Sequence, residues 1–93
     1  MRFPVALTYH VFEKIRAIDM TLAEFEQLLG RGEVIEEHRR TDTQVEELVL
    51  ISEWSRPLHL VVIVDDAKAE ERILTVYEPD PGLWSHDYRT RRS

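Results

Sequence analysis

The stretch that decides the fold is Leu58-His59-Leu60-Val61-Val62-Ile63-Val64. Its aliphatic and β-branched side chains are nearly continuous, with His59 as the one interruption, and such a run is typical of a central β-strand. Ser55-Arg56-Pro57 precedes it as a turn, because proline fixes φ and restricts the residue before it. The polar residues 65–68 form a tight connection on the other side. We therefore expect a β-sheet with residues 58–64 at its centre.

Three further strands are predicted around this one. Residues 33–39, 44–54 and 71–78 show a twofold alternation of side chains. The links between consecutive strands are short and turn-like, and this favours antiparallel pairing, since a parallel neighbour needs a crossover of about a dozen residues or more. The sequence thus predicts a four-stranded antiparallel meander over residues 33–78.

Residues 8–32 predict two helices. Thr8 is the expected N-cap of the first. Thr21 and Glu24 have the spacing of a capping box at the start of the second. Gly30 and Gly32 follow the second helix and tolerate the left-handed geometry that ends many helices. Apolar residues at helical spacing form the expected inward stripes: Val11, Phe12, Ile15 and Ile18 in the first helix, and Leu22, Phe25, Leu28 and Leu29 in the second.

The 93 residues leave room for one hydrophobic core. Helices that precede a sheet generally pack against one of its faces. We expect a single α+β domain over residues 1–93, with two N-terminal helices in residues 8–32 packed on the four-stranded antiparallel sheet of residues 33–78. Pro79-Asp80-Pro81-Gly82 prevents further regular structure, so residues 79–93 form a C-terminal tail.

The net charge of the chain and its distribution limit the kinds of ligand that the chain is expected to bind. The chain has a net charge of −6 at pH 7, which disfavours a protein that holds nucleic acid by overall charge. The charge is uneven: residues 19–53 sum to −7, whereas residues 84–93 sum to +2. We therefore expect an anionic ligand only near the strand ends and the tail.

The sequence disfavours a metal or cofactor site, a membrane span and secretion. The chain has no cysteine, and His10, His38, His59 and His86 lack the spacing that brings two imidazoles together, so we expect no metal and no cofactor. The longest apolar run, residues 60–64, is far shorter than the about 20 residues of a membrane span. The apolar patch within residues 1–7 ends before a secretory core forms. A cytoplasmic protein without membrane contact is expected.

His59 is the leading candidate for chemistry. A histidine in an aliphatic strand must find a hydrogen-bond partner in the core or emerge at an uncovered face. Arg56 lies three residues earlier, and Tyr77 lies on the expected neighbouring strand. Such a set suits metal-independent RNA cleavage, with His59 moving a proton, Tyr77 as a positioning donor, and a guanidinium holding the phosphate. The phosphate would contact Arg56 and Arg89. The alternative is a structural histidine whose partners lie in the core.

The tail combines aromatic rings with positive charge, which single-stranded nucleic acid binders use. These residues are Trp84, Tyr88, Arg89, Arg91 and Arg92. In the alternative interpretation, Trp84 and Tyr88 fix the tail against the sheet, and the arginines neutralise the acidic body.

Several motifs carry a resemblance to a known family. They are Gly32-Glu33-Val34-Ile35-Glu36, Arg56-Pro57-Leu58-His59-Leu60-Val61-Val62, Thr75-Val76-Tyr77-Glu78-Pro79-Asp80-Pro81 with Trp84, and Tyr88-Arg89 with Arg91. On these motifs the chain resembles, from about residue 10 to residue 92, a small prokaryotic family catalogued as a domain of unknown function.

That family is distantly similar to the RelE/ParE and BrnT toxins, in which two helices precede an antiparallel sheet. RelE-type members cut messenger RNA on the ribosome, ParE-type members poison gyrase, and BrnT-type members are RNases neutralised by an antitoxin. The resemblance implies toxin-like, RNA-directed activity and an antitoxin-like partner. It also implies an accessory basic pair, His10 and Lys14. Family members tend to have Arg-Gly where this chain has Ile18-Asp19, so the arginine of that position is missing.

A rival function is a non-catalytic protein-binding module that captures its partner through an edge strand or the tail. The acidic surface suits a basic, antitoxin-like partner. A homodimer paired through edge strands is another form of this alternative.

Overall fold

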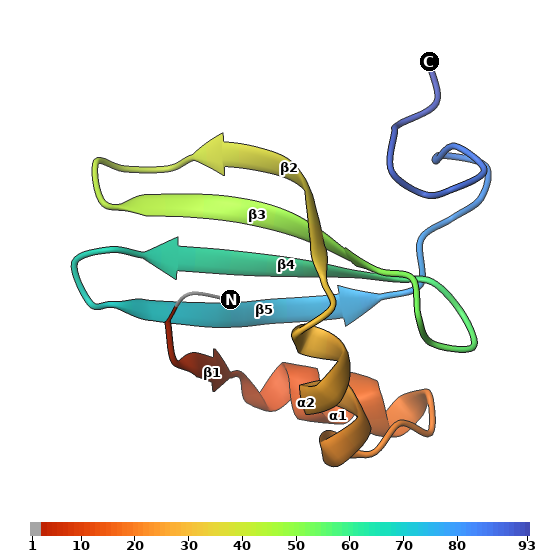
Figure 1. The fold of residues 1–93 in the computed structure, drawn as a ribbon, viewed down its shortest axis with the longest axis horizontal. Coiled ribbons are helices and arrows are strands. Elements are labelled where there is room, and N and C mark those ends of the chain that lie inside the picture. Colours follow the sequence, from red (N-terminus) through yellow and green to blue (C-terminus); the bar gives the residue numbers. More distant parts are fainter. Residues whose placement is uncertain (1–2) are drawn as a thin grey trace.

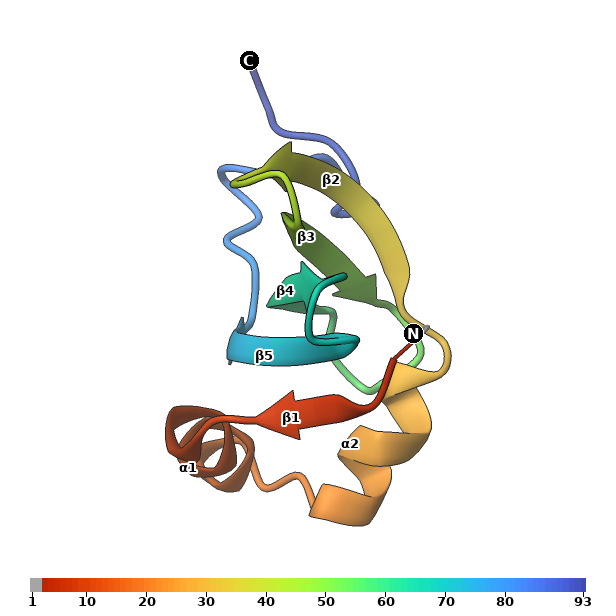
Figure 2. The same ribbon diagram turned by 90° about the vertical axis from the view of Figure 1, so that its left-hand side faces the viewer.

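The computed structural model describes residues 3–93, and Met1 and Arg2 of the expected domain lie outside the described residues. The described chain contains two helices and five strands. In chain order these are β1 (Val5–Leu7), α1 (Tyr9–Ala17), α2 (Leu22–Leu29), β2 (Glu33–Arg39), β3 (Gln44–Ile51), β4 (Leu58–Asp65) and β5 (Glu70–Tyr77). The fold is α+β, and both helices lie on the same side of the sheet (Figures 1 and 2).

The sheet differs from the prediction in one strand. Its order is β1-β5-β4-β3-β2, and the four strands from β2 to β5 form the expected antiparallel meander. β1 adds a fifth strand, parallel to β5, with Val5 opposite Glu71. The prediction of a purely antiparallel, four-stranded sheet was therefore wrong. β1 escaped detection because its three residues are too few to establish a twofold pattern.

The strand boundaries agree closely with the prediction, with one exception. β3, predicted over residues 44–54, ends at Ile51, and Trp54 lies in the loop that follows. β4 is the central strand, and Leu58, Leu60 and Val62 are fully buried. These side chains share the helix-covered face with Phe25 of α2 in one apolar core. Val11, Ile15, Met20, Val49, Ile51, Val64, Ile73 and Val76 complete that core.

Both predicted helix starts are confirmed. The Thr8 hydroxyl accepts a hydrogen bond from the Val11 amide, and Thr21 and Glu24 form the reciprocal capping box. The stripe predictions hold in part: Val11, Ile15 and Phe25 are buried, whereas Leu22 is exposed. Leu22 is the first residue of α2.

α2 ends at Gly30 as predicted, but the conformations at the helix ends differ from the prediction. α1 ends in a Schellman motif, in which the Asp19 amide donates to the Arg16 carbonyl and the Met20 amide to the Ile15 carbonyl. Asp19 takes the left-handed conformation, with φ of 59°, at the position where the resemblance expects glycine. No described glycine has a positive φ, so the left-handed geometry expected for Gly30 and Gly32 was wrong. Gly32 instead permits close approach, because a Cβ there would lie 2.6 Å from Val49 Cγ1.

Candidate functional site

The tail, residues 79–93, covers one end of the sheet on the face opposite the helices. Leu50, His59 and Tyr77 lie opposite one another in register across β3, β4 and β5 at this end. After β5 the chain runs past the strand ends to the side of β2 (Figure 2). Trp84 is the one buried aromatic side chain of the tail. The tail and the three strand residues form a cluster that we call the tail-covered site.

His59 is at the centre of the tail-covered site and has no exposed surface. Its Nε2 lies 2.9 Å from the Tyr88 carbonyl oxygen, so this nitrogen donates. Its ring meets the Trp84 ring edge to face, with centroids 4.5 Å apart. Burial lowers the pKa of His59 below its usual 6.5, and the hydrogen bond to Tyr88 offsets part of this effect. His59 is therefore neutral near pH 7.

Tyr77 is the group that the structure brings to His59 as expected from the sequence. Its hydroxyl lies 3.4 Å from Nδ1 of His59, and the two ring centroids are 5.6 Å apart. Burial raises the pKa of Tyr77, so the phenol keeps its proton at neutral pH. With Nε2 of His59 protonated, Nδ1 is the acceptor and the phenol the donor. Both ring nitrogens of His59 thus have partners within the chain.

Two tail arginines bind β2 rather than an open surface. The Arg89 guanidinium lies 2.9–3.0 Å from both carboxylate oxygens of Glu33. Arg91 lies 2.8 and 3.2 Å from the two oxygens of Glu36, and its Cζ sits 4.7 Å from the Trp84 ring centroid. These hydrogen bonds lower the pKa of Glu33 and of Glu36. The pairs attach the tail to β2 and neutralise two acidic residues.

Arg56 contacts groups other than His59. Its Nε lies 3.2 Å from a carboxylate oxygen of Glu78, and its Cζ is 4.9 Å from the Trp54 ring centroid. Its Nη2 also lies 3.5 Å from the Ile18 carbonyl oxygen. Arg56 therefore connects the loop before β4 to the end of β5 and to the turn after α1.

The accessory pair lies elsewhere. His10 Nε2 is 3.0 Å from the Thr75 hydroxyl, so this histidine attaches α1 to β5, and Lys14 is exposed one turn further along α1.

Over residues 3–93, no group of three or more His, Asp and Glu side chains is arranged to hold a metal ion. None of the helices in that range is both long and apolar enough to cross a membrane.

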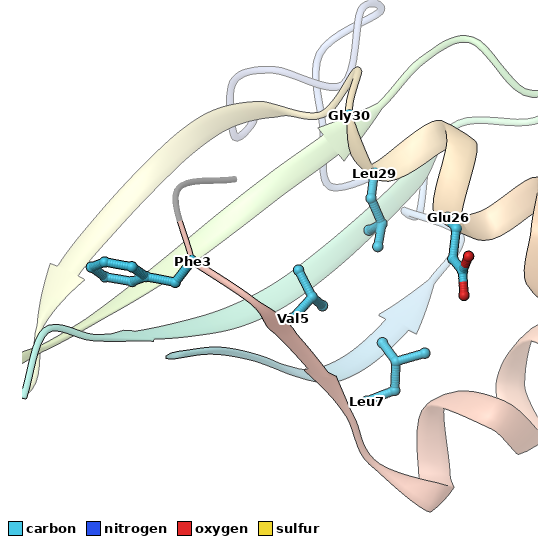
Figure 3. Close-up of a pocket in the computed structure, with 6 residues that line it drawn as sticks. All are labelled: Phe3, Val5, Leu7, Glu26, Leu29 and Gly30. Carbon is cyan, nitrogen blue, oxygen red and sulfur yellow. The ribbon is translucent and has the colours of Figure 1, made fainter. Parts of the chain in front are cut away.

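A second feature, absent from the sequence prediction, is a hollow between β1 and α2. It has a volume of about 380 Å³ and is lined by Phe3, Val5, Leu7, Glu26, Leu29 and Gly30 (Figure 3). We call it the β1–α2 hollow. Phe3, Val5 and Leu7 alternate directly before the N-cap of α1, but this stretch is too short to identify a strand from the sequence, so only the structure shows that these apolar side chains line one hollow.

The model of a family described as a domain of unknown function, DUF4258, matches residues 7–78. The chain belongs to this family. His59 and Tyr77 lie inside the matched part of this DUF4258 chain, whereas Trp84, Tyr88, Arg89 and Arg91 lie outside it. No curated protein and no solved structure matches the chain.

Proposed function

We propose that this DUF4258 chain is a non-catalytic protein-binding module that holds a segment of its partner along an exposed edge of the sheet. The state of the tail-covered site carries the proposal. A general base must reach the proton that it removes, and His59 is fully buried with partners on both ring nitrogens. The cations expected to hold phosphate, Arg56 and Arg89, pair with Glu78 and Glu33.

The sheet, in contrast, has two edges at which a further strand could be added. β1 and β2 are its outer strands, and each has a neighbouring strand on one side only in the described part of the chain. Main-chain groups at such an edge bind an extended segment by strand addition. The net charge of −6 favours a basic partner. Resemblance to BrnT-type toxins, which an antitoxin neutralises, is consistent with such a partner.

A second candidate function is toxin-like RNA cleavage, and one observation favours it. His59 and Tyr77 are directly opposite on β4 and β5, so an imidazole and a phenol are adjacent beneath the tail. Tyr88 has a φ of 61°, a left-handed conformation that is costly for a bulky residue, and this strain favours release of the tail. Tyr77 is already 36% exposed, and release of the tail would expose His59 beside it to a ligand.

Co-expression with the product of the adjacent gene, together with an RNA cleavage assay, tests the proposal. We expect a stoichiometric complex by size-exclusion chromatography with light scattering. We expect no cleavage of a defined messenger RNA by the chain or by Trp84→Ala, in which the tail is loosened. Leu83→Ala is the matched control, because Leu83 is adjacent but exposed.

Two results would overturn the binding module. One is RNA cleavage that rises in Trp84→Ala and disappears when His59→Ala is added, which would establish the second candidate function. The other is a chain that forms no complex with the adjacent gene product.

A further inference from the structure

We infer that the β1–α2 hollow is the docking surface for an extended segment of a partner protein, with apolar side chains at alternate positions and a lysine or arginine facing Glu26. The inference rests on the proposed function and specifies the edge and the partner chemistry. Three independent features of the hollow support it: main-chain groups, apolar lining and charge.

The main chain of β1 offers hydrogen bonds on its outer side. The Pro4 carbonyl accepts from the Glu71 amide of β5 at 3.0 Å. The main-chain N–H and C=O groups of successive residues point to alternate sides of a strand. Those of Ala6 therefore also point toward β5, and those of Val5 and Leu7 point away from it. No other described strand pairs with β1. An added strand would therefore find two donors and two acceptors.

The apolar lining matches an alternating segment. Val5 and Leu7 project toward the hollow from β1, and Leu29 projects toward it from α2 (Figure 3). Val5 is 38% exposed, although it lies in a strand beside the core. Alternate side chains of an added strand would point to the same face as Val5 and Leu7 and fill the hollow. Filling it removes apolar surface from water, which stabilises the complex.

The negative charge of Glu26 specifies the third feature of the partner, a basic side chain. Glu26 extends from α2 at the rim of the hollow, and it has no ion pair among residues 3–93. Glu24 is the other charged residue of α2, so the helix carries no positive charge. A lysine or arginine on the added segment would complement Glu26. A second copy of this chain would instead bring another acidic α2, which opposes self-association at this surface.

A peptide titration by NMR tests the inference. The probe is a capped eight-residue peptide that alternates valine with threonine and has lysine in place of one central valine. A matched peptide has glutamate at that position. We expect the lysine peptide to bind more tightly and to slow hydrogen exchange at the Val5 and Leu7 amides.

Substitutions in α2 make the test specific. Glu26→Lys should weaken binding of the lysine peptide by about two- to fivefold, the range of a surface ion pair, and strengthen binding of the glutamate peptide. Glu26→Gln and Gln27→Lys each raise the net charge by one, but only Glu26 lines the hollow. The first should weaken lysine-peptide binding and the second should not.

Three results would overturn the inference: equal binding of both peptides, slowed exchange at β2 amides instead of β1, or a concentration-dependent dimer that Val5→Lys abolishes. Co-expression of Val5→Lys with the adjacent gene product separates the two proposals. If that complex persists while the peptides fail to bind, the hollow is excluded and the binding module stands. If neither the peptides nor the gene product binds, both proposals fail.

Discussion

The two faces of the sheet are covered in different ways. On the helix-covered face, apolar side chains such as Phe25 and Leu60 are fully buried in one continuous core. On the opposite face, Leu50 and His59 are fully buried in the tail-covered site, and the tail adds Trp84 as its one buried aromatic side chain, together with hydrogen bonds and ion pairs. Apolar burial is strong and non-directional, whereas hydrogen bonds are weak in net terms and directional. The larger apolar cluster on the helix-covered face therefore supplies more of the stability, and the directional tail contacts fix the position of the tail.

The largest expected effect comes from Phe25→Ala on the helix-covered face. The substitution removes a fully buried ring and leaves a cavity, so the free energy of unfolding should fall by about 3–5 kcal/mol. Urea unfolding followed by circular dichroism measures it. Leu83→Ala, at an exposed position, should change the free energy by less than about 0.5 kcal/mol. Equal effects of the two substitutions would remove the distinction between the faces.

A smaller global effect is expected for Trp84→Ala on the tail-covered face. A buried tryptophan in a core typically contributes about 3–5 kcal/mol, but the tail can open without the sheet, so global unfolding should change by less. Hydrogen exchange should accelerate at the Ser85 and Arg92 amides, which bond to Thr90 and Leu83 within the tail. Equal acceleration throughout β4 would instead show that the tail unfolds with the core.

The smallest change in the free energy of unfolding is expected on mild acidification. Burial lowers the pKa of His59 in the folded chain, so below about pH 6.5 the unfolded chain binds a proton that the folded chain does not. Stability contributed by neutral His59 is present above that pH and is lost as the pH falls toward the folded-state pKa. The slope for one proton is at most about 1.4 kcal/mol per pH unit.

Urea midpoints at pH 7.5, 6.5 and 5.5 measure this slope. The lowered pKa values of Glu33 and Glu36 act at lower pH, below their usual 4.5, so they do not contribute to this window. The variant His59→Leu should have a shallower slope over the same range. An unchanged slope would assign the pH dependence to the other histidines.

Local features could be read from the sequence because neighbouring residues create them. The caps at Thr8 and Thr21 and the limits of β2 depend on side chains within a few residues, and all three are confirmed. The sequence also places His59 and Tyr77 on neighbouring antiparallel strands, but their direct pairing depends on a register shift between Val61 and Val62 that the short turn does not predict. Their catalytic role stays a prediction.

Contacts across long separations could not be read in this way. Arg91 pairs with Glu36 across 55 residues, and the partner of His59 is a backbone carbonyl, which has no residue-type signal. The sequence offered two interpretations for the tail arginines, RNA binding and neutralisation of the acidic body. The position of the tail beside β2 decides which carboxylates they meet.

The sequence by itself determined the two capped helices, the four-strand meander and the presence of a histidine in its central strand, because periodicity and capping act over short distances. Tertiary structure alone decided that Val5–Leu7 joins β5 as a parallel edge strand, that the tail closes over His59, and that Glu26 meets an apolar hollow. Each of these requires segments distant in the chain to meet, and only packing of the whole core sets which segments become neighbours.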